Sequence, residues 1–255
     1  MTRYSLVLAA AVAASFVLGA GEVRAEPIPA NIAAAVGDGN RPDTDKARDA
    51  NRKPAETLAF TGVKSGASVA ELLPGGGYFT RIFSKAVGSS GHVYALVPAP
   101  SPDAPADAPD FAARVKALAA DPNYANVQVV VEPFSQLSVP APVDLVWTSQ
   151  NYHDLHNFPG LDVGIFNKMV FDDLKHGGIF LILDHSAEPG SGARDTATLH
   201  RIEAETVKRE VLAAGFVFVG SSDLLRQSGD SRKVKVFDPT VRGRTDQFIL
   251  KFRKP

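Results

Sequence analysis

Apolar runs of strand length alternate along this chain with stretches in which apolar residues recur at helical spacing. Seven runs predict strands, at Ser68–Leu72, His92–Val97, Val127–Val131, Asp144–Thr148, Ile179–Leu183, Phe216–Ser221 and Gln247–Phe252. The clearest helical patterns are at Phe79–Val87, Phe111–Ala120, Val163–Leu174 and Thr198–Ala214. Strands that alternate with helices form a parallel sheet with helices on both faces. The pattern therefore predicts a fold of the α/β class.

The N-terminus has the pattern of a secretory signal peptide. Arg3 precedes an apolar run from Leu6 to Ala20, and a small-residue V-x-A pattern at Val23 to Ala25 precedes Glu26. A membrane anchor is the competing interpretation, but the run is shorter than the ~20 residues that span a bilayer. We therefore expect residues 1–25 to be cleaved after Ala25. The mature protein is then expected to be periplasmic or secreted, with no stable membrane insertion.

The next segment differs in composition from the rest of the chain. Residues 26–44 are rich in Ala, Gly, Pro and Asp and are expected to be a mobile leader, and a charged arm of short helical pieces interrupted at Pro54 follows. We take residues 26–60 as this leader and arm, and residues 61–255 as one α/β domain. Arg48, Arg52 and Lys53 either face a substrate or form a solvated charged face, and the solvated face is favoured.

Three consecutive glycines follow the first predicted strand. The strand ends in an acid, Glu71, and the segment VAELLPGGGYFTRI carries Gly75, Gly76 and Gly77 into an amphipathic stretch. Glycines let the backbone approach a ligand closely, and the next helix offers unpaired N–H groups at its start. A plain tight turn would give the same string. The surrounding α/β pattern favours a cofactor site.

Composition and charge exclude several kinds of chemistry and of binding partner. The net charge is −1 and the chain has no cysteine, which excludes disulfides and thiolate chemistry. No basic cluster interleaved with aromatic residues is present, so we expect no nucleic-acid partner. A small-molecule substrate is the expected partner.

The chain resembles class I S-adenosylmethionine-dependent methyltransferases, and most closely a bacterial group of predicted methyltransferases of which several are exported. The resemblance implies a Rossmann-like fold with a seven-stranded, mostly parallel sheet, S-adenosyl-L-methionine as the cofactor, and methyl transfer to a small-molecule acceptor. The segments that carry it are RDANRKPAETLAFTGV (48–63), VAELLPGGGYFT (69–80), SQNYHDLHN (149–157), LILDHSAEPGSG (181–192), LHRIE (199–203), AAGF (213–216) and VFDPTVRGRTDQFILKF (236–252).

The resemblance also implies a set of cofactor-binding residues. Glu71 takes the acidic position and Gly75 and Gly77 the later glycine positions, while Leu73 replaces the usual first glycine. The full predicted set is Glu71, Pro74, Gly75, Gly76, Gly77, Tyr78, Glu132, Phe134 and Asn151. Of these, Glu132 and Phe134 take the positions that hold the adenine edge and ring, although core packing accounts for Phe134 equally well.

One expected cofactor ligand is missing. The family places a second acid at the end of the second strand to hold both ribose hydroxyls, whereas this strand ends in ALVPAP. Asp103 or Asp107, in the Pro- and Ala-rich loop 98–110 that follows, are the alternatives for that contact.

Catalytic candidates follow the fourth and fifth predicted strands, whose carboxyl ends meet at the ligand-binding edge of an α/β sheet. His153 is the first candidate for a base or a substrate contact, with Asp154, Asp184 and His185 as the others. A structural histidine is the alternative for His153, and turn capping is the alternative for the pair after the fifth strand.

Metal-dependent hydrolysis is a less favoured alternative. His153 with His156, and His200 with Glu203, have spacings that metal ligands use, but two such pairs need not converge, and no metal is expected. His200 and Glu203 are instead expected to be a polar helix flank or a wall of the substrate pocket.

The predicted export conflicts with S-adenosylmethionine as the cofactor, because that molecule is made in the cytosol and does not cross membranes freely. A non-catalytic extracytoplasmic binding protein for a nucleoside-like or other small ligand is therefore the alternative function. A dehydrogenase is disfavoured because no GxGxxG has the correct spacing.

Overall fold

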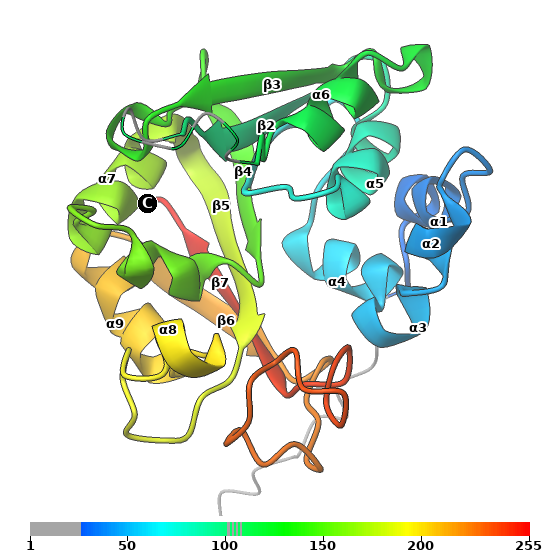
Figure 1. The fold of residues 1–255 in the computed structure, drawn as a ribbon. Coiled ribbons are helices and arrows are strands. Elements are labelled where there is room, and N and C mark those ends of the chain that lie inside the picture. Colours follow the sequence, from blue (N-terminus) through cyan, green and yellow to red (C-terminus); the bar gives the residue numbers. More distant parts are fainter. Residues whose placement is uncertain (1–26, 101–102, 104, 106, 108) are drawn as a thin grey trace, which may run out of the picture.

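The centre of the molecule is a seven-stranded sheet in the order β3-β2-β1-β4-β5-β7-β6 (Figure 1). The computed structural model describes residues 27–100, 103, 105, 107 and 109–255. β7 is antiparallel to both of its neighbours and the other pairs are parallel, so the predicted fold class is confirmed. The strands are β1 (Ser68–Leu72), β2 (His92–Pro98), β3 (Val127–Glu132), β4 (Val143–Ser149), β5 (Leu174–His185), β6 (Val217–Ser222) and β7 (Gln247–Arg253).

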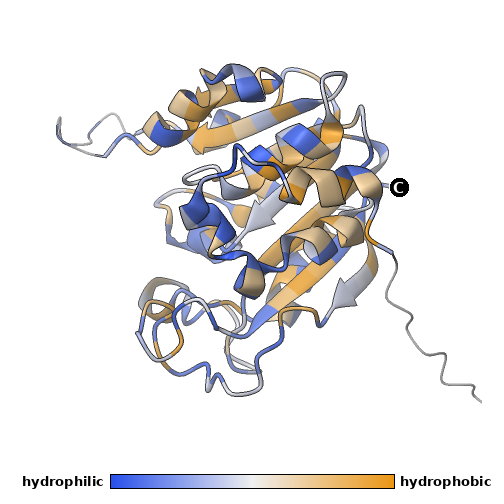
Figure 2. Ribbon diagram, turned by 90° about the vertical axis from the view of Figure 1, so that its right-hand side faces the viewer, coloured by the Kyte–Doolittle hydropathy of each residue, from blue (hydrophilic) through white to orange (hydrophobic). Residues whose placement is uncertain are grey.

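Helices cover both faces of this sheet. Two clusters of buried apolar side chains form the core, one under α1, α4, α5 and α6 and the other under α7 and α9. Figure 2 shows the strongly apolar residues concentrated along the strands between these layers. The helices are α1 (Ala30–Val36), α2 (Asp43–Lys46), α3 (Asp49–Arg52), α4 (Pro54–Thr61), α5 (Tyr78–Val87), α6 (Ala113–Ala119), α7 (Val163–Asp173), α8 (Thr196–Leu199) and α9 (Ala204–Ala213), with 3-10 turns η1 (Pro122–Tyr124), η2 (Phe134–Gln136) and η3 (Tyr152–Asn157).

The N-terminal arm is part of the core. Ile32 in α1 is fully buried and Leu58 in α4 is too, and both belong to the apolar cluster that includes β1 and α5. Arg41, 2% exposed, pairs with Asp49 at 2.6 Å between Nη2 and Oδ1. The expectation of a mobile leader is therefore wrong for residues 30–44, because the apolar side chains of α1 pack on α5 and the ion pair of Arg41 fixes the segment that follows.

The predicted signal peptide, residues 1–25, lies outside the described residues, so the peptide and its cleavage stay predictions. The division of the chain at residue 60 also stays a prediction. Among the helices that the structure describes, none has both the length and the hydropathy to cross a bilayer.

The helix predicted over residues 198–214 is interrupted. α8 ends at Leu199, His200 adopts a left-handed backbone with φ 56°, and α9 begins only at Ala204. Two contacts keep residues 201 and 202 out of the helix. Ile202 forms a β-bridge with Ser186, and the buried Arg201 pairs with Asp230. Periodicity alone could not show that these residues leave the helix, and the break places His200 at the edge of the sheet.

Candidate active site

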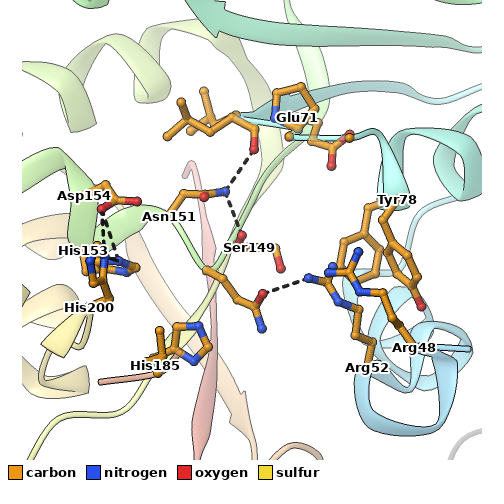
Figure 3. Close-up of a pocket in the computed structure, with 18 of the residues that line it drawn as sticks. Arg48, Arg52, Glu71, Tyr78, Ser149, Asn151, His153, Asp154, His185 and His200 are labelled. Atoms are coloured by element: carbon orange, nitrogen blue, oxygen red, sulfur yellow. Dashed lines mark hydrogen bonds and ion pairs between the residues drawn. The ribbon is translucent and has the colours of Figure 1, made fainter. Parts of the chain in front are cut away.

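A cavity of about 350 Å³ opens at the carboxyl edge of the sheet, above the ends of β1 and β4. The strand order reverses between these two strands, which is where open α/β sheets bind ligands. Figure 3 shows arginines of the N-terminal arm on one side of the cavity and a His/Asp cluster on the other. The predicted site residues that line it are Glu71, Pro74, Gly75, Gly76, Tyr78, Asn151, His153, Asp154 and His185.

The glycine turn after β1 leaves bare backbone against the cavity. Leu73 and Gly75 both have left-handed backbones, with φ 54° and 58°. A Cβ built on Gly75 would meet nothing within 4 Å, so the space beside this residue is open. Gly77 differs, because its Cβ would lie 2.5 Å from Leu118 Cδ1. Gly77 therefore allows α6 to pack closely, and it does not line the cavity.

Glu71 is buried at the end of β1. Its side chain is 3% exposed and accepts a 2.6 Å hydrogen bond from the Thr80 hydroxyl. Burial raises the pKa of Glu71 to about 8, so at neutral pH most of the population carries a proton. A cationic ligand in the cavity would favour the ionised form.

Two arginines of the N-terminal arm enter the cavity beside Tyr78. The guanidinium carbon of Arg52 lies 4.6 Å from the Tyr78 ring centroid, and that of Arg48 lies 5.2 Å from it. Arg52 Nη2 also donates to Gln150 Oε1 at 2.9 Å. Burial lowers the pKa of Arg52 to about 10, which leaves it charged at neutral pH. The favoured solvated face is wrong for Arg52, which is partly buried, whereas Arg48 is exposed and lines the cavity as well. Their i, i+4 spacing is the signal that they share one side.

Asn151 ties the two loops of the cavity together. Its side-chain Nδ2 donates to the Leu73 carbonyl at 3.0 Å and to the Ser149 carbonyl at 2.7 Å (Figure 3). The loop after β4 is thus fixed to the turn after β1. A cofactor contact by Asn151 stays a prediction.

His153 is held between two carboxylates. Its Nδ1 lies 2.8 Å from Oδ1 of the fully buried Asp184, and its Nε2 lies 3.3 Å from Asp154 Oδ1. Burial by itself would lower the pKa of His153, but the two carboxylates outweigh it and raise the pKa to about 10. Asp184 stands behind His153 and does not line the cavity. At neutral pH His153 carries a proton and is a donor to the cavity.

The pKa of His185 is shifted in the opposite direction from that of His153. His185 is 8% exposed, its Nδ1 lies 2.8 Å from Thr245 Oγ1, and burial lowers its pKa to about 4. Its Nε2 has no hydrogen-bond partner among the described residues. His185 is therefore a neutral imidazole with one free nitrogen in a wall of the cavity.

Two further residues, His200 and Phe237, line this side of the cavity, and sequence reasoning missed Phe237. The break before α9 brings His200 Nδ1 to 3.4 Å from His153 Nε2, and Phe237, from the segment between β6 and β7, packs on the His200 ring at 4.9 Å between centroids. His200 is thus a wall of the cavity, one of its two predicted places. Glu203 is not, because its carboxylate accepts the backbone N–H groups of Gly190 and Gly192.

Two predicted adenine contacts lie away from this cavity. Phe134 packs on Phe158 at 4.2 Å between ring centroids, and Glu132 is exposed at the end of β3. The structure does not bring either side chain to the cavity, and packing accounts for Phe134. The lining includes neither Asp103 nor Asp107.

The fold is similar to those of known structures. The structure of an S-adenosylmethionine-dependent methyltransferase from Aquifex aeolicus is 18% identical over 84% of this chain and 99% of that chain, with a TM-score of 0.55. The glycopeptide N-methyltransferase MtfA complexed with sinefungin is 18% identical over 82% of this chain and 86% of its own, with a TM-score of 0.54. The [4+2]-cyclase SpnF is 17% identical over 86% of this chain and 84% of its own, with a TM-score of 0.56.

No protein-family model matches the chain, and no curated protein matches it. The likeness to the solved structures shows the fold, which is the Rossmann-like fold of class I methyltransferases. Because SpnF, whose structure is described as that of a cyclase, has this fold too, the activity must be argued from the site.

Proposed function

We propose that this protein is an S-adenosyl-L-methionine-dependent methyltransferase that acts on a small-molecule acceptor. The observation that carries the proposal is that a single cavity joins the open backbone at Gly75 to the His/Asp cluster after β4 and β5. The first is a place for the cofactor and the second a place for the acceptor.

The residues of the cavity fit the methionyl part of the cofactor. Arg48 and Arg52 supply positive charge for its carboxylate, and the carboxyl group of Glu71 suits its cationic groups. The volume of about 350 Å³ lies within the range of small-molecule sites. When bound, the cofactor supplies a methyl group that its sulfonium already makes electrophilic.

The chain itself then has to position the acceptor and handle its proton. Alignment of the nucleophile supplies much of the rate in such a transfer. His185 is unprotonated at neutral pH and has a ring nitrogen without a partner among the described residues at the cavity wall, so it can accept a proton from a hydroxyl or amine, while His153, with Asp154 and Asp184, holds an acceptor oxygen. These four residues are the proposed catalytic set, with the base moved from His153 to His185.

A binding protein without turnover is the second candidate. It is favoured by the end of β2, where Pro98, the last residue of the strand, stands in place of the acid that holds the ribose in the class I family. Such a protein would bind a nucleoside-like or other small ligand in the same cavity and show no methyl transfer.

Calorimetry with S-adenosylmethionine and S-adenosylhomocysteine tests the proposal. Binding with micromolar affinity is expected, and methyl transfer to a member of an acceptor panel would separate the enzyme from the binding protein. Gly76→Leu should weaken binding strongly, since this residue lines the cavity and an added Cβ meets only Arg114, at 3.9 Å. Gly39→Leu is the matched control, because its Cβ meets nothing within 4 Å and it lies outside the cavity. Absence of binding to the wild-type protein would overturn the proposal.

We further propose export to the periplasm or the medium, supported by the apolar run 6–20 and the V-x-A pattern at 23–25. Mass spectrometry of the protein from fractionated bacteria should find a chain that begins at Glu26 outside the cytosol. Leu8→Arg interrupts the apolar run and should leave the full chain inside. An unprocessed chain that stays in the cytosol would contradict export.

A further inference from the structure

Three potential metal ligands converge on the acceptor side of the cavity. The pairwise distances are 3.3 Å between His153 Nε2 and Asp154 Oδ1, 3.4 Å between His153 Nε2 and His200 Nδ1, and 3.7 Å between His200 Nδ1 and Asp154 Oδ1 (Figure 3). The pairs that the sequence spacing suggested do not form, because His156 faces Glu210 instead. Two of the three ligands, His153 and Asp154, come from η3, and His200 comes from the break between α8 and α9.

These distances fit a single ion. The point equidistant from the three atoms lies about 2.0 Å from each, as follows from the sides of the triangle. Zinc binds imidazole nitrogen at about 2.0–2.1 Å and carboxylate oxygen at about 2.0–2.2 Å. An ion could therefore bind near this point with almost no movement of the side chains.

We propose that His153 Nε2, Asp154 Oδ1 and His200 Nδ1 bind one divalent transition-metal ion whose remaining coordination positions face the cavity. Two imidazoles and one carboxylate suit Zn²⁺, Co²⁺, Fe²⁺ or Mn²⁺, whereas Mg²⁺ and Ca²⁺ prefer oxygen donors alone.

The structure also supplies the supporting contacts that metal-binding histidines have. Asp184 binds the other ring nitrogen of His153 at 2.8 Å, which directs Nε2 toward Asp154. His200 is set by its left-handed backbone and by the ring of Phe237. The ligands are thus pre-positioned by groups that do not themselves bind the ion, and this observation is independent of the triangle.

The charges around the cluster favour a cation. Asp154 and Asp184 place two carboxylates at His153, and Asp184 is fully buried. On the proposed function, the open positions fit an acceptor that offers an oxygen atom.

Titration with metal alone tests the site. The full chain, purified without a polyhistidine tag and stripped with a chelator, would be titrated with Co²⁺ by visible absorption and with Zn²⁺ by calorimetry. One ion per chain with micromolar or tighter affinity is expected, and Mg²⁺ should not compete. Competition by Mg²⁺ at equal concentration, or the lack of any Co²⁺ or Zn²⁺ binding, would overturn the proposal.

Three variants locate the ion. Asp154→Asn removes the charge at constant shape, and His200→Gly removes an imidazole at a backbone position that glycine favours. Each should weaken Zn²⁺ binding by tenfold or more, whereas His156→Ala, in the same turn of chain as His153, should bind as the wild type does. Unchanged affinity in both cluster variants would refute the assignment. No cofactor is present in these titrations, so a failure to bind metal would leave the methyltransferase proposal standing. Equally, a failure to bind S-adenosylmethionine would leave the metal site standing.

Discussion

The carboxylate of Asp184 holds His153 at two points. Asp184 Oδ2 accepts the backbone N–H of His153 at 2.7 Å, and Asp184 Oδ1 lies 2.8 Å from the ring Nδ1. Main chain and imidazole are therefore both fixed from the end of β5, and Nε2 is the atom that faces Asp154. Asp184 therefore positions His153 at the rim of the cavity.

Asp184→Asn is expected to destabilise the fold by about 3–5 kcal/mol, the cost of removing one partner of a buried ion pair. An amide cannot accept the N–H groups of His153 and His185 and the ring contact together. Urea unfolding measures the loss. The control is Asp172→Asn, which removes an exposed pair with Lys168 and should cost less than about 1 kcal/mol. Equal stabilities would show that Asp184 does not hold the rim.

Glu71→Gln should raise the stability of the protein at high pH. The ordinary pKa of the carboxyl is 4.5 and the folded value is about 8. Below the lower value both states are protonated. Between the two values the unfolded chain ionises while the folded chain keeps its proton, so the wild type loses stability as pH rises. Glutamine does not titrate and still accepts from Thr80.

The melting temperature of Glu71→Gln relative to the wild type should thus increase from pH 5 to pH 8 and then level off. At the plateau, the free energy of unfolding of Glu71→Gln should exceed that of the wild type by an amount on the order of a few kcal/mol. A difference that does not change with pH would show that the buried carboxyl does not carry its proton in the folded state.

The sheet could be predicted from the sequence because each strand is a local signal. β1 has the predicted bounds, Ser68–Leu72, and the other strands differ mainly at their ends. The longest difference is in β5, which begins at Leu174 rather than Ile179, because His176 to Gly178 pair with the chain terminus in spite of their polarity. Apolar runs bounded by turns are readable without knowledge of distant contacts.

The His200 side of the site could not be predicted in this way. Residues 198–214 satisfy helical periodicity, and the break at His200 depends on Arg201, whose partner Asp230 is distant in sequence. The same holds for the arm, where Arg52 meets Gln150 across 98 positions. Long-range ion pairs and hydrogen bonds produce no periodic pattern along the sequence. The sequence therefore predicted the glycine turn and the histidines of the cavity, but not the contact of Arg52 with Gln150 or that of His200 with His153.

Arg201→Lys should destabilise the protein by about 3 kcal/mol or more, since Arg201 binds both oxygens of Asp230 and is fully buried with it. A lysine cannot make the paired contact. Arg194→Lys is the matched control, because Arg194 makes a similar two-point pair with Asp195 but is 64% exposed, and it should cost less than about 1 kcal/mol. Chemical denaturation compares the two, and similar losses would contradict the role of burial.

His185→Gln is expected to reduce methyl transfer by a factor of about 10²–10⁴ and to leave cofactor affinity unchanged. Glutamine can keep the contact with Thr245 but cannot accept a proton at neutral pH. Single-turnover rates with an identified acceptor, together with calorimetry, measure both quantities. His156→Gln, beside Glu210 and outside the cavity lining, should leave the rate unaltered. A wild-type rate in His185→Gln would remove this residue as the base.

Gly75 and Gly77 should respond differently to the same substitution. Both have left-handed backbones, with φ 58° and 80°, so alanine costs about 1–2 kcal/mol at either position. At Gly77 the added methyl also meets Leu118 Cδ1 at 2.5 Å, which adds about 1–3 kcal/mol of overpacking. At Gly75 the methyl enters open space at the cavity, so ligand binding should weaken there instead.

A double-mutant cycle separates these costs. In the wild-type background Gly77→Ala should be less stable than Gly75→Ala in urea unfolding. Leu118→Ala removes the atom that collides and is itself costly, by about 2–5 kcal/mol, because Leu118 is 5% exposed. In the Leu118→Ala background the two glycine variants should be nearly equal in stability, since the closest remaining contact of a Cβ at Gly77 is 3.3 Å to Arg81 Nη1, the end of a flexible side chain. If Gly77→Ala stays the less stable of the two, close packing against α6 is not the reason that this position needs glycine.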